Sequence, residues 1–202
     1  QVCHALAYIH GEGIVHCDLK PDNIIITRDG RIVLVDFGLA ARFGARLDSE
    51  EIESAGLMAG STYYMAPERI RGEAFDARAD LYSLGVMLYQ VLTGQLPFQM
   101  RDRAKVLYAH LHADPLPVQE IVPDVHPMLA RVVGQLLAKD PAARPGHAFV
   151  VREALGRMAP TTLSEVDLPT PRAYLYNPRL IGRDAVFGRL ERRLEDARLG
   201  EG

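Results

Sequence analysis

Two stretches, HCDLKPDN at residues 16–23 and DFG at residues 36–38, are the most informative about the fold and the chemistry of this chain. Asn23 and Asp36 offer an amide carbonyl and a carboxylate from two neighbouring segments. Mg²⁺ is a hard cation that prefers such oxygen ligands, and nucleotide phosphates would complete its coordination. The two side chains are therefore candidate metal ligands.

Asp18 remains as a carboxylate without an obvious metal, and Lys20 follows it by two residues. The carboxylate could accept a proton from an attacking hydroxyl, and the ammonium group could offer positive charge to a phosphoryl group in transfer. The alternative is that the acidic and amide side chains in this stretch only form turns and cap helix ends by hydrogen bonds to nearby backbone groups. We favour the functional interpretation, because the layout as a whole is that of phosphoryl transfer.

The flanking sequence predicts mostly helix. Residues 2–10 carry apolar side chains at helical spacing. Two β-branched runs, at 24–27 and 31–37, are joined by a short turn that ends in glycine, which predicts a hairpin. From 38 to 65 no periodicity is sustained, which indicates a long surface loop of the kind that usually carries function.

The longest helix is expected at residues 77–93, because this segment is apolar nearly all round and ends before Gly94. We expect it to be the central helix of the domain. Further helical patterns cover about 101–112, 126–138 and 146–157. The fold class predicted from these patterns is mainly α with a small β-hairpin.

Composition narrows the class of protein. The 202 residues are 48% hydrophobic and 24% charged with a formal net charge of -3, which excludes disorder as the main state and gives no long-range attraction for nucleic acid. No apolar stretch is long enough for a membrane span, and two cysteines cannot make a disulfide framework. A soluble protein of the cytoplasm is the expectation, with no nucleic acid as partner.

The ordered motifs HxDLKPxN, DFG, MAPE at 65–68 and DLYSLGVMLYQVLTGQLPF at 80–98 resemble the C-terminal lobe of a eukaryotic-like serine/threonine protein kinase, closest in style to bacterial members. The resemblance covers about residues 1–158. It implies an α+β kinase C-lobe, with ATP and Mg²⁺ as cofactors and proteins with Ser or Thr acceptors as partners. The lysine two residues after the aspartate favours Ser/Thr over Tyr substrates.

By this resemblance Asp18 is the catalytic aspartate, Lys20 the catalytic-loop lysine, Asn23 and Asp36 the metal ligands, and Ile25 part of the floor of the adenine pocket. Other matched positions would support the loop without reacting. They comprise His16 packed on Phe37, Gly38 of the DFG motif, Asp80 as acceptor of backbone N–H groups, and a buried ion pair between Glu68 and Arg144.

Two positions depart from the family's usual pattern. Ser61 stands where a threonine is usual, near the catalytic aspartate, and a serine hydroxyl can still serve there. Cys17 stands where many kinases have an arginine that receives an activation-loop phosphate, which a thiol cannot do. We therefore expect activation not to depend on loop phosphorylation. The activation segment, residues 36–68, nevertheless carries four candidate phosphorylation sites, among which the sequence does not choose: Ser49, Ser54, Ser61 and Thr62.

The sequence contains no glycine-rich GxGxxG loop, no strand lysine in a VAIK-like setting and no helix-C glutamate of the kind that the family has. We therefore expect the N-terminal lobe to be absent and the chain by itself to be inactive or nearly so. Residues 159–178 look like a proline-rich linker. Residues 179–202 resemble the beginning of a P-loop ATPase module acting in cis, the alternative being an ordinary amphipathic surface helix.

Three readings of the function stay open. The first is an active Ser/Thr kinase, and the second is a pseudokinase-like docking or regulatory module without transfer activity. The third, a small-molecule phosphotransferase related to aminoglycoside kinases, is disfavoured by Glu68, whose motif shapes a peptide-binding groove. Of the remaining polar residues, Cys17 is expected as a small buried filler. His110 and His112, like His4, His10, His126 and His147, are expected at solvated helix ends rather than on a metal.

Overall fold

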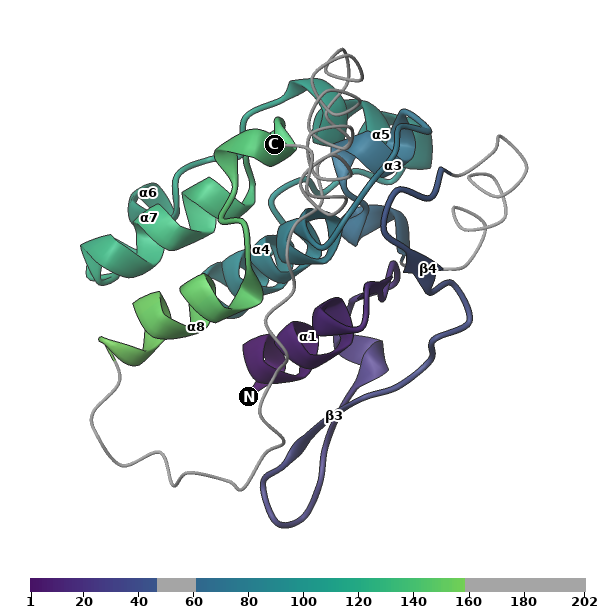
Figure 1. Ribbon diagram of the computed structural model, residues 1–202. Helices are drawn as coiled ribbons and strands as arrows, with labels where there is room; N and C mark the ends of the chain where they lie inside the picture. Colours follow the sequence, from purple (N-terminus) through teal and green to yellow (C-terminus); the bar gives the residue numbers. More distant parts are fainter. Residues whose placement is uncertain (47–60, 159–202) are drawn as a thin grey trace, which may run out of the picture.

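Helix α4, Arg78–Thr93, is the centre of the fold and matches the predicted central helix. The computed structural model describes residues 1–46 and 61–158. Among these, α4 runs through the middle of the molecule in Figure 1, with the other long helices around it. The helix ends at Gly94, whose φ of 74° is the left-handed conformation that favours glycine at a helix end.

The apolar character of α4 all round has a packing reason. Tyr82 and Val86 join one buried cluster, whereas Leu81 and Leu84 join a second cluster that also contains Leu6. A helix that supplies two clusters from opposite faces needs apolar side chains on both faces. The apolar pattern therefore indicates a central position for the helix, although Val91 in its last turn is exposed.

The other long helices lie close to their predicted ranges: α1 (Val2–Gly11), α5 (Arg103–His112), α7 (Pro127–Leu136) and α8 (Ala148–Gly156). In Figure 1, α7 runs along α4, and α1 lies against α8. The α4–α7 contact is close because position 85 is glycine: a Cβ there would lie 2.6 Å from the Cβ of Leu136.

The predicted hairpin is present as strands β2 (Ile24–Ile26) and β3 (Ile32–Leu34), which pair antiparallel with Ile25 opposite Val33. A second small sheet was not predicted: β1 (Ile14–Val15) pairs antiparallel with β4 (Ala41–Arg42). Two-residue strands carry no alternation that a sequence pattern could reveal. The segment expected to be a continuous loop thus begins with a strand.

Short helical turns complete the described residues. They are η1 (Pro21–Asn23), η2 (Ser61–Tyr64), α3 (Pro67–Ile70), α6 (Val118–Ile121) and η3 (Pro141–Ala143). The single turn α6 lies between the helices predicted at 101–112 and 126–138, in a stretch with several prolines where the sequence shows no helical pattern. Among the described residues no helix is both long and apolar enough to cross a membrane. The predicted linker at 159–178 and the predicted module at 179–202 lie outside the described residues.

Candidate functional site

The loop at residues 16–23 is fixed to the central helix by Asp80. This carboxylate is buried and accepts hydrogen bonds from the backbone N–H of His16 at 2.8 Å and of Cys17 at 2.9 Å, and it lies 2.8 Å from the Nε2 atom of His10. Burial alone would raise its pKa, but the hydrogen bond and charge of His10 and the two backbone N–H groups hold the pKa of Asp80 below its usual value.

His16 links this loop to the strand that precedes the DFG motif. Its Nε2 atom lies 3.1 Å from the carbonyl oxygen of Val35, and its Nδ1 atom accepts a hydrogen bond of 3.4 Å from the backbone N–H of Asp18. Both contacts are satisfied by one neutral tautomer, protonated at Nε2. The ring also packs against Phe37, with centroids 4.7 Å apart, as the sequence predicts.

Four predicted site residues meet in direct contact. Lys20 Nζ donates to the Asp18 carboxylate at 2.7 Å and to the Ser61 hydroxyl at 2.9 Å. Asn23 Nδ2 donates to the same carboxylate oxygen at 3.0 Å and to the backbone carbonyl of Asp18 at 2.8 Å. All four side chains belong to buried residues. A carboxylate held by an amide and an ammonium group is fixed in orientation, as a proton acceptor must be.

Asp36 reaches the site through the backbone rather than by a side-chain contact. The N–H of Val35 donates to the carbonyl of Asn23 at 3.0 Å, which sets the residue after Val35 beside the loop. Asp36 has a φ of 63° and an exposed side chain, whose Oδ1 accepts from the N–H of Gly38 at 3.3 Å. Asp36 thus follows β3 closely in the chain and has its carboxylate exposed.

The donor set fits a hard cation and a nucleotide. Because Asn23 Nδ2 points at Asp18, its amide oxygen points away from that residue, and the Asp36 carboxylate is exposed. Oxygen donors of these two kinds suit Mg²⁺ with phosphate oxygens. Ile25 is 48% exposed and sits opposite Val33, which is 40% exposed, so the hairpin presents an apolar pair to which a base could pack. Within the described ranges no group of three His, Cys, Asp or Glu side chains could hold a metal.

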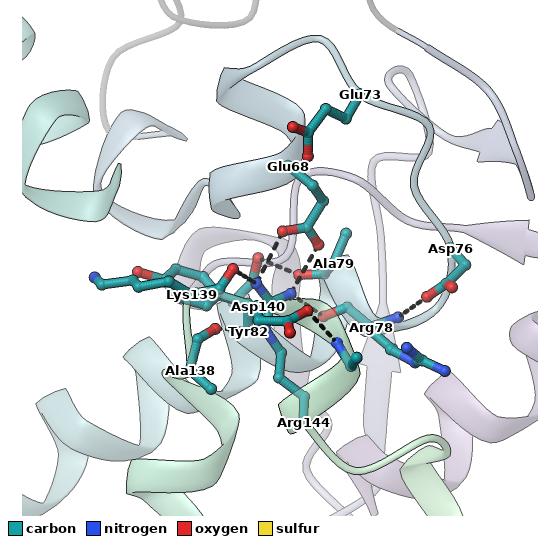
Figure 2. A network of polar contacts seen from close by, with 12 residues as sticks. Glu68, Glu73, Asp76, Arg78, Ala79, Tyr82, Ala138, Lys139, Asp140 and Arg144 are labelled. Atoms are coloured by element: carbon teal, nitrogen blue, oxygen red, sulfur yellow. Dashed lines mark hydrogen bonds and ion pairs between the residues drawn. The ribbon is translucent and has the colours of Figure 1, made fainter. Parts of the chain in front are cut away.

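The predicted ion pair between Glu68 and Arg144 is present and buried (Figure 2). The guanidinium group also donates to the carbonyl oxygens of Arg78, Ala138 and Lys139. Its plane lies over the Tyr82 ring, 4.8 Å from the centroid. The pair thus ties α3, which follows Ser61, to the central helix and to the chain after α7.

Several expectations about single residues need correction. His4, His10 and His110 are buried rather than solvated. His10 faces Asp80, and His110 Nδ1 lies 2.7 Å from the Tyr82 hydroxyl. Ser61 and Thr62 are buried, so neither hydroxyl is open to a modifying enzyme in this structure. Ser49 and Ser54 lie outside the described residues.

Cys17 is a buried filler, and burial raises the pKa of its thiol to about 12. One contact of this residue was missed: Arg69 donates from Nη1 to the carbonyl oxygen of Cys17. No spacing in the sequence signals this contact, because 52 residues separate the partners.

The chain is similar to a known protein family and to several curated bacterial proteins. The family model described as protein kinase domain matches residues 1–155. The chain is 43% identical over 159 residues to the serine/threonine-protein kinase Pkn1 of Myxococcus xanthus, covering 77% of this chain and 22% of that protein. It is 39% identical over 158 residues to the serine/threonine-protein kinase PknB of Mycolicibacterium smegmatis, covering 78% of this chain and 25% of that protein.

A third relative, the serine/threonine-protein kinase pkn3 of Myxococcus xanthus, is 34% identical over 205 residues, covering 93% of this chain. The match spans 38% of that protein. The chain therefore spans well under half the length of each of these curated relatives.

Proposed function

The chain belongs to the protein kinase family, and from this membership we propose that the protein containing it transfers the γ-phosphoryl group of ATP to Ser or Thr hydroxyls of proteins. The observation that carries the proposal is the buried contact set of Asp18, Lys20, Asn23 and Ser61. The similar bacterial proteins are named serine/threonine-protein kinases, which supports the same substrate class.

In this proposal Asp18 orients the acceptor hydroxyl and takes its proton. The carboxylate is held in place by Asn23 Nδ2 and Lys20 Nζ, so little reorganisation is needed when the hydroxyl arrives. Lys20, which also bonds the Asp18 carboxylate, places its positive charge where negative charge develops on the phosphoryl oxygens. Phosphoryl transfer depends mainly on such positioning and electrostatic stabilisation.

Asn23 and Asp36 are the residues that would hold Mg²⁺, which when bound neutralises the charge of the phosphate oxygens. Ile25 would pack against the adenine base. The Ser61 hydroxyl, bonded to Lys20, connects the loop of Asp18 to the segment that leads to Glu68. That segment is therefore the part of the described chain best placed to align a protein substrate with Asp18.

We propose further that residues 1–158 act as the C-terminal lobe of the kinase and need a nucleotide-covering lobe to be active. The chain holds the candidate metal ligands and the candidate base but no GxGxxG sequence. A cytoplasmic location for this part of the protein, and an ATPase module beginning at 179–202, remain predictions.

The test is transfer of labelled γ-phosphate from ATP to a generic protein substrate by the complete gene product. Replacing Asp18 by Asn should lower kcat by roughly 100- to 10,000-fold, the range for loss of a general base, without loss of folding. Asp22→Asn is the matched control, because Asp22 is exposed and lies in the same loop.

The alternative is a docking module that transfers no phosphate. Wild-type protein that binds ATP and Mg²⁺ but is no more active than its Asp18→Asn variant would favour this alternative over the kinase.

A further inference from the structure

The peptide that precedes Asp18 is held in an unusual conformation. Cys17 has a φ of 68°, in the left-handed region that favours glycine, although it carries a side chain. Such a conformation persists only where the surrounding structure imposes it. One constraint is Asp80, which accepts the hydrogen bond of the Cys17 N–H from the side of α4.

The second constraint comes from Arg69 on α3. Its Nη1 atom donates to the carbonyl oxygen of Cys17, so the residue is held at both its N–H and its C=O group, by two different helices. Arg69 is 3% exposed, and its guanidinium group lies 5.6 Å from the centroid of the Phe75 ring. The side chain is thus packed on an aromatic face as well as hydrogen-bonded, which fixes the direction of its donor.

The helical turn α3, which carries Arg69, is itself held in place. Glu68, the residue before Arg69, is held by Arg144 in the buried ion pair. Arg69 reaches from that anchored turn to the peptide group that joins Cys17 to Asp18. A change in the direction of this peptide group turns the backbone of Asp18, and with it the carboxylate that Lys20 and Asn23 bond.

We propose that Arg69 is a positioning residue for Asp18: by holding the Cys17 carbonyl it sets the orientation of the Asp18 carboxylate. The proposal rests on the kinase function proposed above for Asp18. Arg69 touches neither acceptor nor nucleotide in this role, so its effect falls on the rate of transfer rather than on ATP binding.

The kinetic test compares Arg69→Ala and Arg69→Lys with wild type in the complete gene product. Arg69→Ala should lower kcat roughly 10- to 100-fold, the scale of a misplaced reacting group, with KM for ATP changed less than about twofold. Added guanidinium chloride, compared with sodium chloride of equal concentration, should restore part of the kcat of Arg69→Ala. It should not raise the kcat of Arg69→Lys or of wild type. Arg71→Ala is the matched control, because Arg71 is exposed at the end of the same turn and pairs only loosely with Glu73 at 3.5 Å.

A second measurement is independent of phosphate transfer. Alkylation of Cys17, followed by mass spectrometry of its peptide, should be faster in both Arg69 variants than in wild type, because the clamp on Cys17 is released. Cys3, which is also buried but lies in α1, should react at an unchanged rate and serves as the internal control.

Unchanged kcat together with unchanged Cys17 alkylation in folded Arg69→Ala would overturn the proposal. Failure of even Arg69→Lys to fold would also overturn it, since the contact would then be a requirement of folding. If wild type transfers no phosphate but Cys17 alkylation still rises in both variants, the kinase function fails while the clamp on the loop stands.

Discussion

Arg144 and Glu68 form an end-on, two-pronged ion pair, with Nη1 to Oε1 at 2.7 Å and Nη2 to Oε2 at 2.8 Å. The side chain of Arg144 is fully buried, and that of Glu68 is 4% exposed. Removing one partner of such a pair strands the other charge away from water. The pair therefore matters most through the cost of breaking it.

We expect Arg144→Ala to lower the free energy of unfolding by about 3–5 kcal/mol, because Glu68 would remain buried without its partner. For a domain of this size the melting temperature should fall by roughly 10 °C. Thermal unfolding followed by circular dichroism measures this, with the exposed Arg131→Ala as control. Equal melting temperatures for Arg144→Ala and wild type would contradict the prediction.

Gly85→Ala should destabilise the protein by about 1–3 kcal/mol through overpacking. The new Cβ would lie 2.6 Å from the Cβ of Leu136 and 3.2 Å from its carbonyl carbon, so backbone as well as side chain must shift. Gly134→Ala is a matched control on the facing helix, since nothing lies within 4 Å of its Cβ. That substitution should instead stabilise by up to about 1 kcal/mol through helix propensity. Chemical denaturation of both variants decides the matter, and equal effects of the two would refute the packing argument.

The sequence predicts what is local or strongly periodic in this chain. The central helix and the hairpin follow from apolar periodicity and turn residues, and the loop of Asp18, Lys20 and Asn23 follows from residue type and spacing. The anchoring of this loop by Asp80 could be named in advance only because the family resemblance supplied a partner 64 residues away.

Other features escaped prediction for a physical reason. The contacts of His10 with Asp80 and of Arg69 with Cys17 join side chains to groups far along the chain. In the sequence, His10 and Arg69 are each only a polar residue in a helical segment, with nothing to indicate the partner. Strand β4 is too short for a pattern. Burial of His110 could not be foreseen, because the tertiary packing of α5 decides which side of a helix end faces water.

Acid should destabilise the protein through His110. Burial, followed by the positive charge of Lys139, lowers the pKa of His110 from 6.5 to about 3. A base whose pKa is lower in the folded state binds fewer protons there than when unfolded. Between these two pKa values stability therefore falls as the pH falls, by about 2 kcal/mol from pH 7 to pH 5.

Denaturation of wild type and of His110→Phe across this range measures the difference. The variant should show a flatter dependence on pH, whereas the exposed His112→Phe should follow wild type. The comparison concerns slopes, because His110→Phe also leaves the Tyr82 hydroxyl without the ring nitrogen that it contacts and shifts the whole curve. Parallel curves for His110→Phe and wild type would contradict the assignment.

The adjacent hydroxyls of Ser61 and Thr62 should differ in importance although both are buried. Lys20 donates to Ser61 Oγ at 2.9 Å, whereas Thr62 Oγ1 has no hydrogen-bond partner in the part of the chain that the structure describes. A hydrogen bond to a charged group contributes about 1.5–3 kcal/mol, so Ser61→Ala should lower kcat about tenfold by loosening Lys20 from its position beside Asp18. Ser61→Thr keeps the hydroxyl, and its kcat should stay within about twofold of wild type.

Thr62→Val, which keeps the shape and removes only the unpaired hydroxyl, should leave kcat unchanged and stability equal or higher. Steady-state kinetics of the complete gene product would separate these cases, and a loss of kcat in Thr62→Val as large as in Ser61→Ala would show that the Lys20 contact is not what distinguishes the two positions.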